Sequence, residues 1–175
     1  MTDTEKESKS DDQFDRLEHA WNIYLNTQEI IKYADQKVHV LIVFTTIVAG
    51  SVILKFDYIL KQGFFNELLA IAFLVVTGFF LMFALLALLA RYDVKGEAIG
   101  PRQVFFRHIQ QRRSAREYAN SFKEASCQDA LDDLCNQIYE VSIITEQKFK
   151  NYRLACITLI VQIILFLIIF IGLAI

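Results

Sequence analysis

The sequence predicts an all-α membrane protein with three transmembrane helices, two of which continue into cytoplasmic amphipathic helical stalks. The first observation is the position of the charges: the 18 basic and 20 acidic residues all lie outside three windows, 38–54, 68–90 and 154–175. The second is that the remainder is densely charged, which excludes a single soluble globule with a mixed core. The third is the absence of glycine and proline from the segments that lead into the first and third windows, which favours uninterrupted helices.

The second and third windows are long enough to span a bilayer. As helices they reach about 35 and 33 Å, and the hydrocarbon core is about 30 Å thick. The first window reaches only about 26 Å, and snorkelling by Lys37 and Lys55 can lengthen it. The alternative for this window is a buried hairpin helix in a soluble domain. We disfavour it because an unambiguous span follows after a short turn.

That turn, residues 55–67, predicts an antiparallel hairpin of the first two spans. Small residues in both spans allow close packing, and they are Gly50, Ser51, Thr77 and Gly78. The alternative is that these four side chains simply face lipid.

Basic residues predict the orientation of the spans. The segment 91–153 contains eleven lysines and arginines, whereas the 55–67 turn contains two. By the positive-inside rule, the long segment and the N-terminus are cytoplasmic and the C-terminus lies at the outer face. The acidic opening is not a signal peptide. Three scattered cysteines fit a reduced compartment without a structural metal.

Outside the spans, apolar residues at alternating steps of three and four predict two amphipathic stalks. The first seam is Phe14, Leu17, Trp21, Tyr24, Gln28 and Ile31. The second is Leu131, Leu134, Ile138, Val141, Thr145, Lys148, Tyr152 and Ala155, with Ser126 or Asp129 as its cap. A short helix is expected near residues 114–125. Because two stalks and one short helix bury little surface alone, we expect a homo-oligomer.

The predicted organisation follows from these segments. It comprises a disordered acidic tail (1–12), a cytoplasmic helix (13–37), the first span (38–54), an outer hairpin turn (55–67), the second span (68–90), a cytoplasmic helical segment (91–153) and the third span (154–175).

No catalytic or metal-binding motif is present. The three histidines are scattered, without HxxxH or HExxH spacing, and there is no GxSxG or phosphate-binding glycine loop. The acidic pair Asp132 and Asp133 is interpreted as part of a solvated face. We therefore predict that the protein is not an enzyme and has no cofactor.

Two regions contain charged or aromatic residues in patterns that helix packing alone does not explain. Asp35 and Lys148 both fall on a stalk seam near the membrane surface, where an unpaired charge is costly, so a cross-helix pair is expected. Lys37 lies beside this pair in the ADQK sequence. The favoured interpretation is a structural tie that orients the stalks, and a switch is the alternative.

The second region is 100–116, GPRQVFFRHIQQRRSAR, which combines arginines with aromatic residues. Arginine can bind phosphate through two hydrogen bonds, and aromatic rings can stack on a base. The favoured interpretation from these residues alone is positive charge near anionic lipid, and a nucleotide site is the minority one.

At these same places the chain resembles the transmembrane effectors of Pycsar, a bacterial antiphage system that uses cyclic pyrimidine nucleotides. Three stretches carry the resemblance: ADQKVHVLIVFTTIVAGSVI at 34–53, the Pro-Arg and Phe-Phe pattern at 101–106, and QIYEVSIITEQKFKNYRLA at 137–155. Their order and spacing match over roughly residues 14–175. The chain departs from the family at Val38 and His39, where small residues are common.

The resemblance implies an effector of the bacterial inner membrane. A neighbouring cyclase would make cUMP or cCMP during infection, and the effector would sense it and impair the membrane, which causes abortive infection. Besides the nucleotide, the expected partners are other copies of the chain and membrane lipid, without DNA or RNA. For the ligand's phosphate the chemistry favours Arg102 and Arg107, and for base stacking Phe105, Phe106 or Tyr118.

Two other functions remain open. One is a constitutive helical scaffold or small channel with no nucleotide ligand. The other, an exporter subunit, is less favoured, because the spans contain no ionisable residue except His39, and transport commonly needs such groups at mid-membrane.

Overall fold

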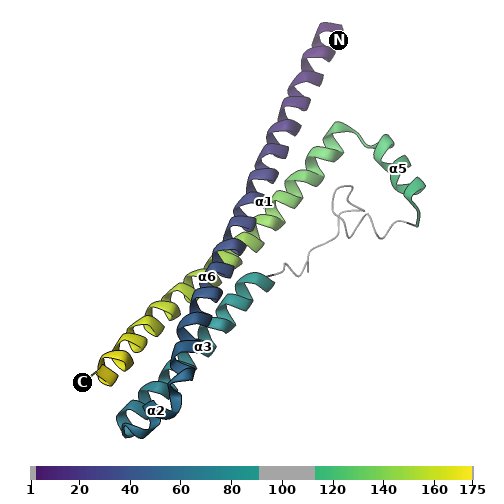
Figure 1. The fold of residues 1–175 in the computed structure, drawn as a ribbon. Coiled ribbons are helices and arrows are strands. Elements are labelled where there is room, and N and C mark those ends of the chain that lie inside the picture. The colour runs from purple at the N-terminus through teal and green to yellow at the C-terminus, as the bar shows by residue number, and fades with distance from the viewer. Residues whose placement is uncertain (1–2, 91–112, 175) are drawn as a thin grey trace. The chain divides into compact units, whose positions relative to one another are not determined.

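The computed structural model describes residues 3–90 and 113–174, with side chains described over 12–90 and 113–172. This part of the chain contains helices and no strands (Figure 1). In order, the helices are α1 (Asp3–Leu54), α2 (Phe56–Lys61), α3 (Phe64–Leu89), α5 (Ala115–Glu124) and α6 (Cys127–Ala174). Three of them, α1, α3 and α6, are long and apolar enough to cross a membrane. The predicted all-α class with three spanning helices is therefore confirmed.

The longest helices are α1, with 52 residues, and α6, with 48. Neither is interrupted, because neither contains proline and glycine is absent before Gly50 in α1 and before Gly172 in α6. Residues 3–12 belong to α1, whereas their polar composition predicted a disordered tail. Glutamate and lysine in this segment favour helix, and adding residues to an existing helix is easier than nucleating one.

The described residues form two compact units. Unit 1 takes its described residues from 3–30 and 113–144, and unit 2 takes them from 31–90 and 145–174. Both α1 and α6 therefore contribute to both units. Only α3, with the short helix α2 before it, belongs to unit 2 alone, and only α5 belongs to unit 1 alone.

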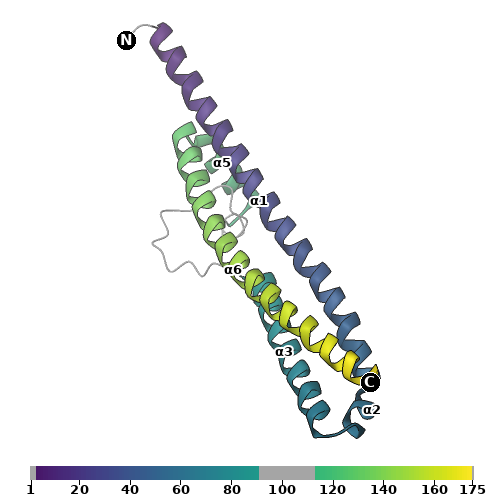
Figure 2. The same ribbon diagram turned by 90° about the vertical axis from the view of Figure 1, so that its left-hand side faces the viewer.

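In unit 2, α1, α3 and α6 lie side by side (Figures 1 and 2), with α3 antiparallel to the other two. Two apolar clusters establish these directions. Cluster A consists of Val38, Phe80, Ala84, Ala87, Ala155 and Leu159. Cluster B consists of Ala49, Val52, Ile59, Ala70, Phe73 and Ile169. Along α1 and α6 cluster A comes before cluster B, whereas along α3 it comes after it.

The connection between α1 and α3 is tight. The helix α2 occupies most of it, and Gly63 then starts α3 with φ at +119°. Glycine reaches this backbone region without the steric cost that a Cβ atom brings. The predicted hairpin turn is thus partly helical, and α3 begins at Phe64, four residues before the charge-free window.

Close packing in unit 2 depends on alanine rather than glycine. A Cβ atom built at Gly50 or Gly78 meets no other atom within 4 Å, so these two glycines do not provide close contact between helices. Buried alanines occupy the interfaces instead, with Ala84 and Ala155 almost fully covered in cluster A. Among the four small residues considered from the sequence, Thr77 is buried and Ser51 is half-buried.

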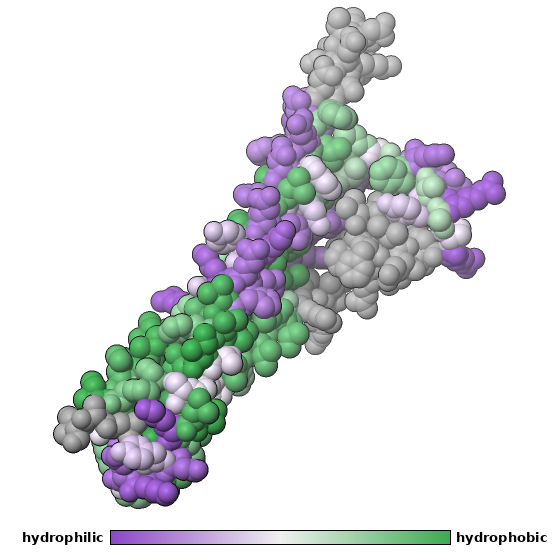
Figure 3. Space-filling view, viewed as in Figure 1, coloured by the Kyte–Doolittle hydropathy of each residue, from purple (hydrophilic) through white to green (hydrophobic). Residues whose placement is uncertain are grey.

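The outer surface of unit 2 is that of a membrane protein. Figure 3 shows hydrophobic side chains covering α1, α3 and α6 in this unit, with hydrophilic side chains gathered at its α2 end. Large apolar residues such as Ile47, Leu85 and Ile160 are about half exposed or more. In water such a surface would be unfavourable, and in lipid it is expected.

In unit 1, α1 and α6 run parallel. The Cys127 thiol lies 3.7 Å from the Gln13 carbonyl oxygen, at the start of this parallel pair. On α6 the predicted seam is largely correct, since Leu134 and Val141 are buried. On α1 it is correct at Leu17, Tyr24, Gln28 and Ile31, which are half-buried, but Phe14 and Trp21 are 67% and 42% exposed, and Ala20 is buried instead of Trp21. The seam prediction favoured large aromatic residues, but a small alanine allows the two backbones to approach.

A serine caps the N-terminus of α5 and another caps the N-terminus of α6. The hydroxyl of Ser114 accepts a hydrogen bond from the Glu117 N–H at the start of α5. At the start of α6, Ser126 and Asp129 form a reciprocal box, in which each side chain accepts from the other residue's backbone N–H. These hydrogen bonds from Ser126 lower the pKa of Asp129. The box is therefore weakened as the pH falls through that lowered pKa.

Candidate functional site

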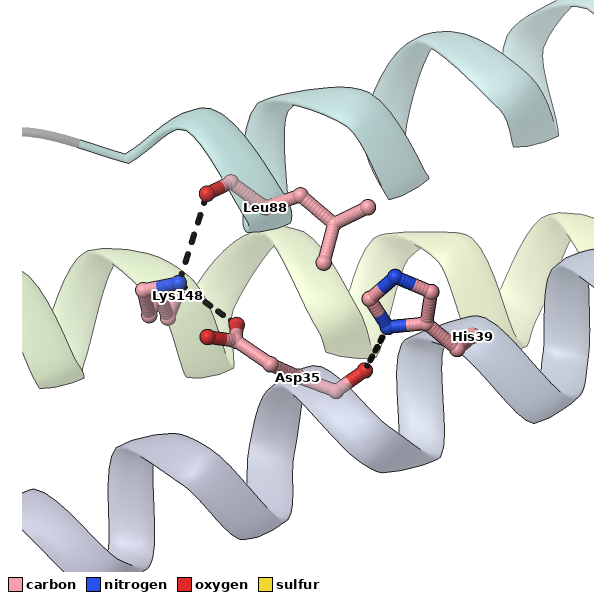
Figure 4. A network of polar contacts seen from close by, with 4 residues as sticks. All are labelled: Asp35, His39, Leu88 and Lys148. Carbon is pink, nitrogen blue, oxygen red and sulfur yellow. Dashed lines mark hydrogen bonds and ion pairs between the residues drawn. The ribbon is translucent and has the colours of Figure 1, made fainter.

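The spans are tied together at one end of cluster A by an ion pair. The Lys148 ammonium on α6 lies 2.5 Å from a carboxylate oxygen of Asp35 on α1 (Figure 4). The Lys148 side chain is 7% exposed and that of Asp35 is 35% exposed. The helical periodicity explains the meeting, since Asp35 lies one turn before Val38 and Lys148 lies two turns before Ala155, both members of cluster A.

The same lysine reaches the third helix. Its Nζ lies 3.4 Å from the carbonyl oxygen of Leu88, in the last turn of α3. The last four carbonyls of a helix have no partner within it, and the helix dipole places partial negative charge there. No basic residue of α3 lies in its own last turn. Lys148 therefore supplies, from α6, the cation that the end of α3 lacks.

Two neighbours of Asp35 play different parts. The ring of His39 donates from Nδ1 to the Asp35 carbonyl oxygen at 2.7 Å, because a carbonyl oxygen can only accept (Figure 4). Lys37, which the sequence grouped with the pair, is exposed and lies over the Tyr33 ring at 5.1 Å. We define the tie as Asp35, Lys148 and the Leu88 carbonyl. Lys37 is not part of it.

Unit 1 contains a groove of about 550 Å³ between α1 and α6. Its apolar lining comes from Ala20, Ile23, Leu131 and Ile138, and its polar lining comes from Asp15, Arg16, His19 and Cys135. The Arg16 guanidinium pairs with Asp12 at 2.8 Å, and both side chains are mostly exposed. The surface of the groove is almost entirely apolar, which suits an apolar or aromatic ring. The sequence did not predict this groove, whose lining includes Ala20 where the predicted seam had Trp21.

Most of the predicted ligand residues lie outside the described residues. This applies to Arg102, Phe105, Phe106 and Arg107. Tyr118 is described: it is half-buried on α5, and its ring centroid lies 6.1 Å from that of Phe122. Tyr118 is not among the residues that line the groove.

One interpretation from the sequence is wrong. Asp132 is exposed as expected, but Asp133 is only 8% exposed, and Gln137 and Glu140 on the same side of α6 are buried too. The Gln137 amide lies 3.4 Å from the Asp133 carboxylate. These three positions are spaced by four and three residues, which places them on one face of α6. The spacing alone did not predict burial, because a polar stripe on a helix is normally a solvated face.

Across residues 3–90 and 113–174, no cluster of histidine, cysteine or acidic side chains has the arrangement of a metal site. The geometry consists of a tie between three spanning helices, a groove in unit 1, and two helices shared by both units.

A family model described as the Pycsar effector protein domain matches residues 19–175. The chain belongs to this family. Membership, together with the three spanning helices, makes this Pycsar effector a membrane protein and indicates a role in antiphage defence. Comparisons with curated proteins and with solved structures find no match. The family assignment therefore depends on the sequence pattern that runs through the tie and the three spans.

Proposed function

We propose that this Pycsar effector senses cUMP or cCMP through its cytoplasmic helices and then impairs the bacterial inner membrane, so that the infected cell stops growing. The observation that carries the proposal is the continuity of α1 and α6, each of which supplies residues to both units without a break. A ligand-induced shift of either helix in unit 1 has a direct mechanical route into the spans. Neither α1 nor α6 is interrupted between its residues in unit 1 and its residues in unit 2.

The ligand acts by favouring one of two arrangements of the stalks. It shifts the equilibrium only to the extent that it binds one arrangement more tightly than the other. The tie at Asp35 and Lys148 is a suitable element to separate the two arrangements, because sliding or rotation of α6 along α1 breaks a short polar contact. The tie then holds the resting arrangement until ligand is bound.

Within the described residues, the groove of unit 1 is our candidate for the nucleotide site. Its apolar floor suits a pyrimidine ring, and Arg16 and His19 can approach a cyclic phosphate. The cluster predicted from the sequence, Arg102 with Phe105 and Phe106, remains a candidate for additional contacts to the same ligand.

We further propose that the working form is a homo-oligomer in the inner membrane, with the N-terminus in the cytoplasm and the C-terminus at the outer face. Phe14 and Trp21 on α1 and Tyr139 on α6 are exposed although they lie outside the apolar spans. Exposed aromatic residues on a water-facing helix are typical of protein–protein contacts. A second copy of the chain, which presents the same surface, fits this role. Lipid surrounds the spans.

Nucleotide binding can be tested on the purified protein in detergent. We expect cUMP or cCMP, but not cAMP, to raise the melting temperature, because a ligand at a hundred times its Kd stabilises the folded state by about 2.7 kcal/mol. Arg16→Ala and His19→Ala should shift the half-saturating concentration upward at least tenfold. Glu18→Ala is the matched control, since Glu18 is exposed on α1 and does not line the groove.

The outcomes separate the rival functions. If neither pyrimidine nucleotide changes the melting temperature, the constitutive scaffold or small channel without ligand is favoured instead. If both nucleotides bind but the two groove variants behave as wild type, the groove is not the site.

A further inference from the structure

The spanning part of unit 2 contains a layer of polar side chains between its two apolar clusters. Each spanning helix contributes one residue: Thr45 from α1, Thr77 from α3 and Gln162 from α6. Along every helix the polar residue is flanked by cluster A on one side and cluster B on the other. All three are buried, with exposed fractions of 1%, 8% and 0%. We call these three residues the polar layer.

The hydrogen bonds of the polar layer are incomplete. The Gln162 amide nitrogen donates to the Thr77 hydroxyl at 2.9 Å, and that hydroxyl donates to the Phe73 carbonyl at 2.8 Å. The Gln162 carbonyl oxygen and the Thr45 hydroxyl, both inaccessible, have no partner in the described residues. The layer is therefore hydrogen-bonded between α3 and α6, and two of its buried oxygens, one on α1 and one on α6, are unpaired.

Such groups are unfavourable in a permanently closed helix bundle. An unpaired polar group inside a membrane is strongly unfavourable, because the hydrocarbon chains of lipid offer it no hydrogen bond. Leucine at position 162 would fill a similar volume without an unpaired oxygen, and would leave the hydrogen bond from Thr77 to Phe73 intact. The glutamine is thus better suited to a second state in which water reaches it.

We propose that the polar layer becomes the water-filled constriction of the activated effector, with Gln162 as its main lining residue. This inference rests on the proposed function and specifies how the membrane is impaired: small ions and water pass through the protein rather than through disordered lipid. The carbonyl and hydroxyl oxygens of the layer can replace part of an ion's hydration shell. The apolar clusters on both sides keep this path dry in the resting state.

Ion flux from lipid vesicles tests the inference. Purified protein is reconstituted into vesicles with an entrapped potassium-sensitive dye, and cUMP or cCMP is added on the stalk side. We expect Gln162→Leu to reduce the nucleotide-induced flux at least tenfold while the nucleotide-induced melting shift is kept. Ile164→Leu is the matched control, because Ile164 lies on the same helix, is 52% exposed and is outside the polar layer. It should behave as wild type.

The two proposals fail in different ways. If the wild-type protein gives no flux, the proposed membrane impairment fails and this inference fails with it. If the wild type conducts and Gln162→Leu conducts equally, only this inference is overturned.

Water access to position 162 gives a second, independent measurement. In a chain whose three cysteines are replaced by serine or alanine, Gln162→Cys should react with a charged thiol reagent at least tenfold faster when nucleotide is present. Ile164→Cys should react slowly under both conditions. Equal rates at position 162 with and without nucleotide, in vesicles that conduct, would contradict the proposal.

Discussion

Replacing Lys148 by methionine should lower the free energy of unfolding by about 2 kcal/mol. The substitution keeps an unbranched side chain as far as the ε position but removes the ammonium that pairs with Asp35 at 2.5 Å. Breaking a fully buried pair by removing one partner costs about 3–5 kcal/mol, because the other charge is left unpaired. We expect less here since Asp35 is 35% exposed and water can partly solvate it. Denaturation in detergent micelles, followed by circular dichroism, measures the change.

A double-mutant cycle provides the control. Asp35→Asn combined with Lys148→Met removes both charges and should be more stable than Lys148→Met alone, because no carboxylate is left without its partner. The Asp35→Asn single variant completes the cycle, and losses of stability from the two single variants that simply add up in the double variant would contradict a direct interaction. Lys37→Met is the matched control for loss of a nearby lysine, since Lys37 lies over Tyr33 outside the tie. Its effect should be small.

Enlarging Ala84 to leucine should destabilise unit 2 by about 3 kcal/mol. Ala84 is completely buried in cluster A, where its small side chain allows α3 to approach the neighbouring helices. Three additional carbon atoms at such a site force the helices apart or force side chains out of their preferred rotamers. Denaturation in detergent micelles, followed by circular dichroism, should show a lower free energy of unfolding for Ala84→Leu than for the wild type.

Gly78→Ala on the same helix should have the opposite sign. A Cβ atom at Gly78 meets nothing within 4 Å, and alanine in a helix is favoured over glycine by about 0.5–1 kcal/mol. A loss of stability from Gly78→Ala comparable to that from Ala84→Leu would show that the glycine, and not the alanine, determines the packing distance.

The sequence predicted the larger features of the fold for a physical reason: a charge-free window of about 20 residues has few alternatives to a membrane span. It also predicted that Asp35 and Lys148 would meet, because both lie on an apolar seam where an unpaired charge is costly. The seam of α1 was harder to predict. Trp21 is more hydrophobic than Ala20, yet the helices pack on Ala20 because close approach favours the smaller side chain.

Two parts of the candidate site required the structure. The groove of unit 1 arises from the way α1 packs on α6, and a seam that could be centred on Trp21 or on Ala20 does not specify it. The polar layer was overlooked because an uncharged glutamine inside an apolar window does not alter a count of charges. Whether Gln162 faces lipid or a neighbouring helix depends on the rotation of α6, which is determined by contacts in three dimensions.

The central claim is that a cyclic pyrimidine nucleotide makes this chain impair the membrane. The most direct measurement is the membrane potential of bacterial cells that express the chain together with an active pyrimidine nucleotide cyclase, followed with a voltage-sensitive dye. We predict rapid depolarisation with the active cyclase and a normal potential with a catalytically inactive one. An unchanged potential, in cells shown to contain both the nucleotide and the folded effector, would contradict the account.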